Sequence, residues 1–469
     1  MGRLKNGKIP HVKKIHSGIR EVQGHVDSGR AGYVFYKKDV DYSVEDVTEY
    51  SYKAAQFAAD FYRYQEDNVP QFFEPFNEPM VHANDFYSKK NNKKYDKEKI
   101  DIAGADMDMF SVHLYDGSGN VNNKGGRRSG SNAEAILDLI EGYSYAKLGR
   151  LKPIAVTEYG RLVQDQPGFP NVPNFEPIEN SQAVRSQIHM VMNFMERGDD
   201  IALIIPFTIG KSKPTFSFSK ASLWTQDKSG KWEFTPRKYF FEIWKDVKGD
   251  RVAISSSNID VQTHAFVDGK ELFVVLNNLN DDSQEVDLAL LDSGNLKKVE
   301  IKSLKIFSDK TPDLSIKETK SAPQKLKLAY GETVVLKYQF KKKIEFENTI
   351  RSKKYYAEKC VTPIVASKEI GFSFKNVKVA KGKATLRLGV GRKNGASLKP
   401  TVLVNGKKVA IATDIIRGYD QHNRKQFFGT LEIPVNIEDL NNGENKVSVK
   451  FEDQGGHISS AILQVQKLD

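Results

Sequence analysis

Cysteine is the residue that this sequence most clearly lacks, since Cys360 is the only one in 469 residues. A single thiol excludes an internal disulfide framework and any metal site built on cysteines, so we interpret Cys360 as a small apolar filler. The sequence also has no phosphate-binding glycine loop before a helix, no His-Glu-x-x-His pair and no nucleophilic serine elbow. We therefore expect neither a cofactor nor a metal.

Long apolar runs are absent as well. No window approaches about 18 consecutive apolar residues, which excludes a membrane-spanning helix. The first eight residues are basic and contain no apolar segment of the kind that a signal peptide needs. Taken literally, this start predicts a cytoplasmic protein.

An excess of acidic residues is also missing, because 71 Lys and Arg against 60 Asp and Glu give a net charge of +11. This charge could favour a polyanion such as a sulfated polysaccharide or a nucleic acid, or it could simply solubilise a large surface. No RNA-binding or helix-turn-helix signature accompanies the basic residues, so we expect no nucleic-acid partner. We expect the chain to act as a monomer.

Two short apolar stretches each end in a glutamate. Residues 70–79 are Pro-Gln-Phe-Phe-Glu-Pro-Phe-Asn-Glu-Pro, and residues 152–160 are Lys-Pro-Ile-Ala-Val-Thr-Glu-Tyr-Gly. Such runs are typical of buried parallel strands. Their polar residues then lie at the carboxyl end, where (β/α)8 barrels have their catalytic residues. Glu78 and Glu158 would supply the two carboxyl groups, about 5 Å apart, that a retaining glycosidase needs.

Strands and helices alternate in the first half of the chain. Residues 107–115 and 201–207 predict two further strands, and Ser131 with Glu134 resembles a capping box that opens a helix. A second helix repeats Val184 and Ile188 at helical spacing and ends near Gly198. This alternation predicts a parallel α/β domain of the TIM-barrel type over residues 1–248.

From about residue 249 the pattern changes to short alternating strands separated by turns, which predicts β-sandwiches. We place one sandwich domain at residues 249–343 and a second at 344–469. Asp268-Gly269 and Asn405-Gly406 each predict a hairpin. The segment that begins at Leu440, Leu-Asn-Asn-Gly-Glu-Asn-Lys-Val, resembles the closing phrase of jelly-roll carbohydrate-binding modules. The predicted architecture is therefore multidomain, a (β/α)8 barrel followed by two β-sandwich domains.

The number of barrel strands is too small for a complete barrel. Eight strands in about 250 residues are needed, whereas we find four clear strands and short candidates such as residues 100–103. We therefore expect that the chain begins inside a longer protein and lacks the first barrel strands and an export signal.

The order of the two glutamates resembles a known clan. Asn77-Glu78-Pro79 followed by Val156-Thr157-Glu158-Tyr159-Gly160 is similar to the acid/base and nucleophile pair of retaining glycosidases built on (β/α)8 barrels. The longer phrase at residues 73–79, the stretch Val112-His113-Leu114-Tyr115 and the two trailing β-domains resemble glycoside hydrolase family 86 more closely. That family comprises β-agarases and β-porphyranases, which cleave red-algal galactans.

The resemblance assigns roles to individual residues. Glu78 would be the general acid/base and Glu158 the nucleophile, while Asn77 would hydrogen-bond the 2-hydroxyl of the sugar. A helix-starting Glu before proline and a surface charge at a strand end are the structural alternatives for the two glutamates. His113 and Tyr115 lie two residues apart, share one face of a strand, and could hold substrate or the nucleophile.

An aromatic residue and a basic segment are further candidates for substrate contacts. Trp224 could stack on the apolar face of a sugar or pack in the core. Lys124, Arg127 and Arg128 lie in a long loop and could contact sulfate.

The implied reaction is retaining endo-hydrolysis of β-1,4 bonds in agarose or porphyran. Another glycosidase of the clan, such as a β-xylosidase or a different agarase family, is an alternative. A non-catalytic carbohydrate-binding protein with a degenerate barrel is a second. Galactan polymers cannot enter a cell, so the substrate predicts a secreted, periplasmic or cell-surface protein.

Overall fold

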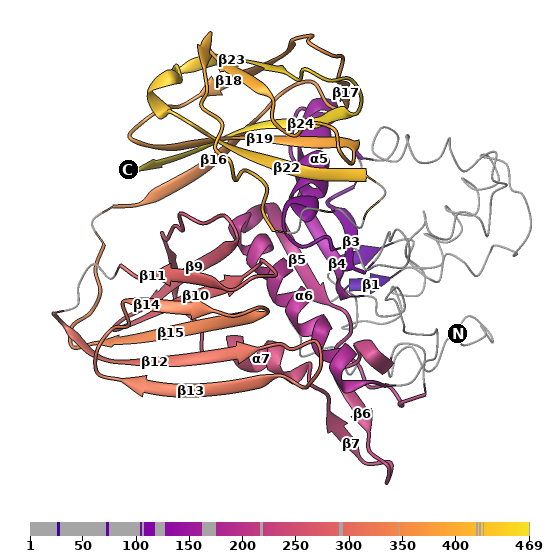
Figure 1. Ribbon diagram of the computed structural model, residues 1–469, viewed down its shortest axis with the longest axis vertical. Helices are drawn as coiled ribbons and strands as arrows, with labels where there is room; N and C mark the ends of the chain where they lie inside the picture. The colour runs from indigo at the N-terminus through magenta and orange to yellow at the C-terminus, as the bar shows by residue number, and fades with distance from the viewer. Residues whose placement is uncertain are drawn as a thin grey trace, which may run out of the picture. The chain divides into compact units, whose positions relative to one another are not determined.

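The computed structural model describes most of the chain beyond residue 107 and short segments before it (Figure 1). The described residues are 26–28, 72–74, 104–105, 107–117, 127–161, 175–215, 219–289, 294–346, 348–418, 421, 424 and 426–468. The chain forms two compact units, Met1–Met107 and Asp108–Asp469.

The first unit contains a parallel pair of strands. β1 (Val26–Ser28) lies beside β2 (Phe72–Glu74), with Val26 opposite Phe72. β2 lies within residues 70–79, so the predicted strand is confirmed there. The candidate strand at residues 100–103 lies outside the described residues.

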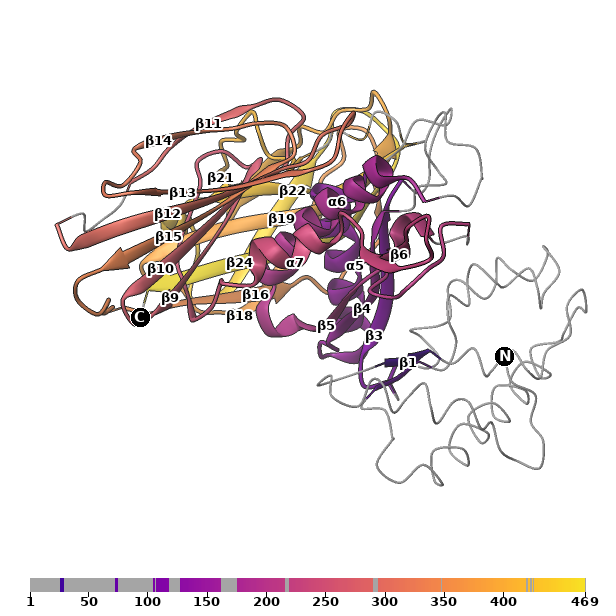
Figure 2. The ribbon, with the colours of Figure 1, turned by 90° about the horizontal axis from the view of Figure 1, so that it is seen from below.

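The second unit begins with a parallel sheet in the order β3-β4-β5. Its elements alternate along the chain as β3 (Phe110–Asp116), α5 (Ser131–Leu148), β4 (Ile154–Arg161), α6 (Pro177–Glu196) and β5 (Ile201–Pro206), as Figure 2 shows. A short hairpin and α7 (Lys238–Trp244) follow. The three predicted strands and their helices are confirmed, whereas closure into an eight-stranded barrel stays a prediction.

The apolar residues of these elements form one core between the sheet and its two helices. Alternation along β3 and β4 turns Leu114 and Tyr159 toward the helices, and the Tyr159 ring meets Phe194 of α6 edge-on at 5.2 Å. The buried members of this core are Leu114, Ala133, Leu137, Ile154, Val156, Tyr159, Met190 and Phe194.

The start of α5 differs from the predicted capping box. The N-cap is Gly130, and no side chain caps the helix. Ser131 Oγ instead accepts a hydrogen bond from Gln421 Nε2 at 3.2 Å, and the Glu134 carboxylate accepts one from Asn193 at 2.7 Å. The prediction was wrong because tertiary partners bind both side chains in preference to the helix end.

The first sandwich covers α6 and α7 with a six-stranded antiparallel sheet in the order β13-β12-β15-β10-β9-β8. Both faces of this sheet are apolar. Phe273 and Val275 pack with α6 and α7, whereas Val274 and Leu276 pack toward a second sheet, β11-β14. The strands are β8 (Asp250–Val252), β9 (Val261–Asp268), β10 (Glu271–Asn278), β11 (Gln284–Asp287), β12 (Leu296–Lys305), β13 (Asp313–Thr319), β14 (Lys325–Leu328) and β15 (Glu332–Phe340).

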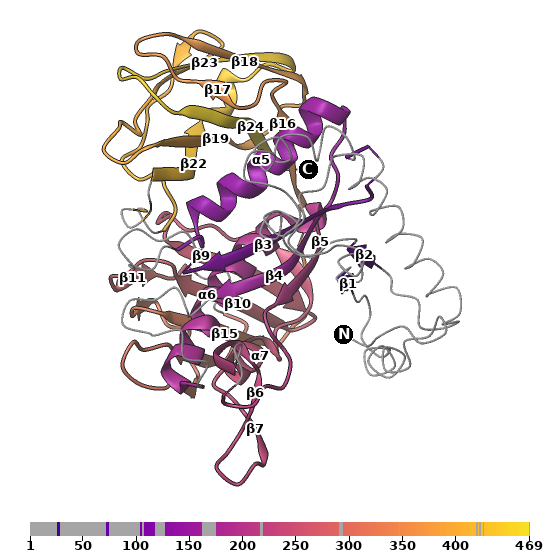
Figure 3. The same cartoon turned by 90° about the vertical axis from the view of Figure 1, so that its right-hand side faces the viewer.

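The second sandwich consists of the sheets β16-β24-β19-β22 and β18-β23-β20-β21 around one apolar core. α5 lies against β22, β24 and β19, as Figure 3 shows. The strands are β16 (Ile350–Tyr356), β17 (Thr362–Pro363), β18 (Ile370–Val377), β19 (Gly382–Lys393), β20 (Thr401–Val404), β21 (Lys407–Lys408), β22 (Gln426–Val435), β23 (Gly443–Lys450) and β24 (His457–Leu468).

Both predicted hairpins form. Val404 pairs with Lys407, so Asn405 and Gly406 make the two-residue turn, with φ of 50° and 83°. Positive φ at both positions is what a type I′ turn requires and what Asn-Gly tolerates. In the β9–β10 hairpin Asp268 pairs with Glu271, so the turn residues are Gly269 and the lysine after it.

An acidic stripe on α5 holds the second sandwich in place. Glu134 and Asp138 lie one turn apart on the same face and are buried. Arg197, which follows α6, binds Glu134 at 2.5 Å, Asp138 at 2.9 Å and Glu141 at 2.6 Å. Arg387 of β19 binds Glu134 and Asp138 from the other side. The carboxylates are therefore shared between the helical layer and the sandwich.

Further sandwich residues complete this network. Lys354 of β16 binds Glu141 at 2.9 Å and Asp200 at 3.0 Å. The Tyr356 hydroxyl donates to Glu141 at 2.9 Å, and the Thr430 hydroxyl donates to Asp138 at 2.8 Å. Each buried charge thus has several partners, which is the condition under which burying it is tolerated.

Candidate active site

Glu158 lies near the carboxyl end of β4, beside His113 of β3. A register shift between Val112 and His113 makes Val112 pair with Val156 and His113 pair with Glu158, which leaves Thr157 as the extra residue. Such a bulge changes the direction of the side chains that follow it. Without it, His113 would lie opposite Thr157.

Two side chains of β3 meet the Glu158 carboxylate. The Tyr115 hydroxyl donates to Oε2 at 2.5 Å, and His113 Nδ1 lies 3.4 Å from the same oxygen. The His113 and Glu158 side chains are 12% and 24% exposed, so solvent reaches the carboxylate only in part. His113 and Tyr115 therefore share one face, as predicted, and both hold Glu158.

The end of β5 supports Tyr115. The Phe207 ring meets the Tyr115 ring edge-on at 5.7 Å. Arg237, which is fully buried, donates to the carbonyls of Phe207 and Ala221, and Gln187 donates to the Phe207 carbonyl at 3.2 Å. Burial lowers the pKa of Arg237 to about 9. Sequence reasoning missed Phe207 and Arg237 as supports of Tyr115, because no local pattern shows which carbonyls or rings a distant side chain will contact.

The chain that leaves β3 is tied back at Asp116. The buried Asp116 carboxylate accepts hydrogen bonds from the backbone amides of Arg128 at 2.5 Å and Ser129 at 3.0 Å, and from the Ser129 hydroxyl at 3.0 Å. These bonds tie residues 128 and 129, just before α5, to the end of β3.

The other predicted site residues either have partners of their own or lie outside the described residues. Asn77, Glu78 and Lys124 lie outside them. Trp224 is in β6 (Trp224–Gln226) and stacks on Phe234 with ring centroids 3.7 Å apart. Arg127 donates to the Asp281 carboxylate at 2.8 Å, so its charge is already partnered.

A metal site finds no structural support in the described ranges: none of their His, Cys, Asp and Glu residues gather in a group of three or more that could hold an ion. In the same ranges, no helix is long and apolar enough to cross a membrane.

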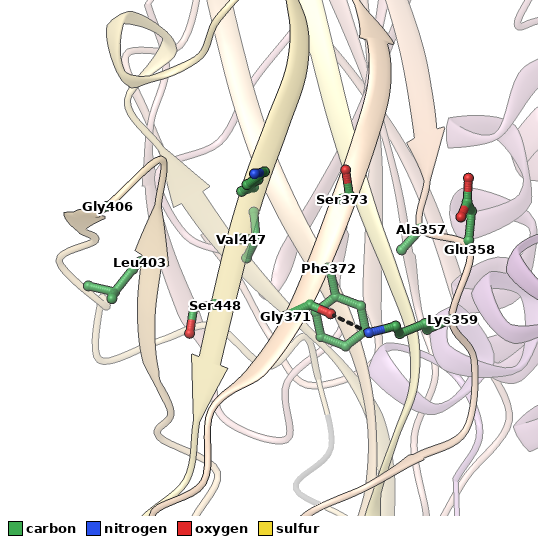
Figure 4. Close-up of a pocket in the computed structure, with 11 residues that line it drawn as sticks. Ala357, Glu358, Lys359, Gly371, Phe372, Ser373, Leu403, Gly406, Val447 and Ser448 are labelled. Atoms are coloured by element: carbon green, nitrogen blue, oxygen red, sulfur yellow. Dashed lines mark hydrogen bonds between the residues drawn. The ribbon is translucent and has the colours of Figure 1, made fainter.

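A separate pocket of about 410 Å³ lies in the second sandwich. Figure 4 shows Gly371, Ser373, Val447 and Ser448 on its strands, with Lys359 donating to the Gly371 carbonyl at 3.4 Å. Among the described residues of its lining, Phe372 is the only one with an aromatic side chain, and this ring is buried in the sandwich core. The pocket therefore lacks an exposed ring on which a sugar could stack.

Two segments of the chain match described protein families. Residues 260–362 match the porphyranase β-sandwich domain 1, and residues 371–466 match the C-terminal domain of β-porphyranase A.

Two curated relatives share more than a third of their aligned residues with this chain. β-Porphyranase A of Phocaeicola plebeius is 36% identical over 88% of this chain and 64% of its own length. A funoran endo-β-hydrolase of Wenyingzhuangia aestuarii is 39% identical over 79% of this chain and 51% of its own length. The chain thus spans between about half and two thirds of the length of these relatives.

Solved structures show the same relationship. A β-porphyranase of glycoside hydrolase family 86 from Bacteroides plebeius matches with a TM-score of 0.76 and 35% identity, covering 90% of this chain and 74% of that one. A GH86 protein in complex with neoagarooctaose matches with a TM-score of 0.77 and 32% identity, covering 91% and 68%.

Proposed function

Because the chain belongs to glycoside hydrolase family 86, we propose that it hydrolyses β-galactosidic bonds in red-algal galactans. The names of its relatives support this substrate class, since they include a β-porphyranase, a funoran hydrolase and β-agarases. The observation that carries the proposal is the Glu158 carboxylate at a strand end, held by Tyr115 and His113.

The proposed reaction is a double displacement at the anomeric carbon. The Glu158 carboxylate attacks that carbon and forms a glycosyl ester, while the bond to the bridging oxygen breaks and Glu78 gives this oxygen a proton. Glu78 then removes a proton from water, whose oxygen attacks the same carbon and releases Glu158. Asn77 would hydrogen-bond the 2-hydroxyl of the sugar.

Tyr115 and His113 orient the nucleophile in this mechanism. Both contact Oε2 of the carboxylate. A carboxylate held in one orientation needs less rearrangement before attack. Trp224 would contact a sugar further along the polymer.

The proposed domain organisation is a catalytic (β/α)8-type domain at residues 1–248 and sandwich domains at 249–343 and 344–469. Since galactan polymers stay outside the cell, we place the activity outside the cytoplasm as well. Agarose and porphyran are the two substrates to distinguish, because porphyran carries sulfate and agarose does not.

The test is product release from agarose and from porphyran by the 469-residue chain and by Glu78→Gln and Glu158→Gln. We expect oligosaccharides from at least one polymer, lost in both variants and kept in Glu285→Gln, which removes an exposed carboxylate of β11. NMR of the first product should show the β-anomer, since two inversions retain the configuration.

Three results would contradict the proposal. An α-anomer as first product would remove Glu158 from the role of nucleophile. Full activity of either glutamine variant would remove that residue from the chemistry. A folded chain that releases nothing from either polymer would show that it is not a galactanase by itself.

A further inference from the structure

One face of the hairpin after β5 is lined with aromatic rings. In β6 and β7 (Trp232–Phe234), Trp224 pairs with Phe234 and Gln226 pairs with Trp232. Because side chains alternate along a strand, these four residues share one face. The Phe234 side chain is 51% exposed although its ring stacks on Trp224. The hairpin thus carries an aromatic ring, Phe234, that is exposed to solvent and packs on Trp224.

Lys211 lies across the same face. It forms an isolated bridge with Trp224, and its ammonium group lies 5.4 Å from the centre of the Trp224 ring and 5.5 Å from that of Trp232. Ring faces attract a cation electrostatically. Among the residues that the structure describes, no carboxylate is paired with Lys211. Its charge is therefore held in place by rings and is available to an anion.

The acidic residues of the hairpin do not compete for Lys211. Glu233 alternates to the opposite face. Asp227 is occupied within the turn, where its Oδ1 accepts hydrogen bonds from the amides of Ser229 at 2.8 Å and Lys231 at 2.9 Å. The turn also carries an exposed lysine, Lys228.

The hairpin is anchored beside the Glu158 site. Lys211 follows Phe207 by four residues, which is at most about 14 Å of chain, and the Phe207 ring contacts Tyr115. Arg237 binds the carbonyls of Phe207 and Ala221, which fixes the start of the loop to the segment before β6. A bound polymer can therefore reach both Glu158 and the aromatic face.

From this arrangement we propose that Phe234, Trp232 and Lys211 form a binding platform for a sulfated galactose unit of the polymer. The rings contact the apolar C–H face of the pyranose, and the Lys211 ammonium pairs with the sulfate ester. The choice of polymer rests on the proposed function, which this platform deepens by assigning the sulfated substrate. Stacking alone would serve agarose and porphyran equally, so the lysine makes the difference.

The experiment measures binding without turnover, in the Glu158→Gln chain, by affinity electrophoresis in gels that contain porphyran or agarose. Lys211→Met should weaken porphyran binding about tenfold and leave agarose binding within about twofold. Phe234→Ala should weaken binding to both polymers. The matched controls are Lys228→Met in the turn and Phe241→Ala on α7, whose side chain is 40% exposed.

Several outcomes would overturn the platform. Equal losses of porphyran binding in Lys211→Met and Lys228→Met would show that the positive charge of the hairpin attracts the polymer without a specific site. Unchanged binding in both Lys211→Met and Phe234→Ala, with unchanged melting temperatures, would show that the face does not bind galactan. Neither result would affect the test of the proposed function, because that test measures the hydrolysis products released by the parent chain.

Discussion

Replacing Arg387 by methionine tests whether the buried charges of α5 depend on the second sandwich. The change keeps an apolar side chain of similar length but removes the donors that reach Glu134 and Asp138. Arg197 would then be the remaining arginine that bonds directly to both of these carboxylates, and it also binds Glu141. Removing one partner of a buried ion network costs about 3–5 kcal/mol, because the remaining charge stays desolvated.

Burial already opposes the ionised form of Glu134, and Arg197, Arg387 and Arg417 together outweigh it and lower its pKa. Losing Arg387 therefore removes part of the attraction that keeps Glu134 ionised in spite of its burial. The assay is hydrogen exchange of those α5 backbone amides that become exposed when the second sandwich separates from the helix. A loss of about 3–5 kcal/mol predicts exchange faster by roughly a hundredfold to several thousandfold.

The control is Lys298→Met, which breaks the solvent-exposed pair with Glu318 and should cost less than about 1 kcal/mol. Adding Asp138→Leu to Arg387→Met should recover part of the loss, since one unpaired carboxylate is then gone. An Arg387→Met chain whose α5 exchanges as slowly as the control would refute the reasoning.

Two further predictions concern stability elsewhere in the second unit. Gly382→Ala should lower the melting temperature, because its Cβ would lie 1.9 Å from the Gln466 carbonyl oxygen. The control Gly371→Ala should leave the melting temperature unchanged, because its Cβ would meet nothing within 4 Å. Equal melting temperatures of the two variants would contradict this prediction. Burial lowers the pKa of His264 to about 4, although its ring bonds the Met192 carbonyl. Between pH 4 and 6.5 the unfolded chain therefore binds a proton that the folded chain does not, so stability should rise with pH across this window. The denaturation midpoint of His264→Gln should therefore rise less steeply with pH in this window than that of the parent chain. An equally steep rise would show that His264 is not the cause.

Local sequence patterns predicted the elements whose structure depends on near neighbours. The stretch Ile154–Val156 has apolar residues on both faces of the strand and forms part of the buried parallel strand β4. Asn405 and Gly406 tolerate positive φ, so they form their turn wherever the flanking strands meet. The alternation that places His113 and Tyr115 on one face likewise follows from the geometry of a single strand.

Features that join distant segments needed the tertiary structure. In the sequence Glu134 stands three residues after Ser131, as in a capping box, yet Arg197 and Arg387 bind it because the fold buries it between them. The pairing of His113 with Glu158 depends on a bulge for which no residue type is diagnostic. The face shared by Lys211, Trp232 and Phe234 appears only when the hairpin has its register.

The sequence by itself thus predicted the strands β3, β4 and β5 with the helices between them, and it made Glu158, His113 and Tyr115 candidates for a site, because periodicity and strand ends are local properties. Only the tertiary structure decided which oxygen of Glu158 the two β3 side chains meet and which charges are shared between α5 and the second sandwich. Those contacts depend on packing between residues far apart in the chain, which no local pattern encodes.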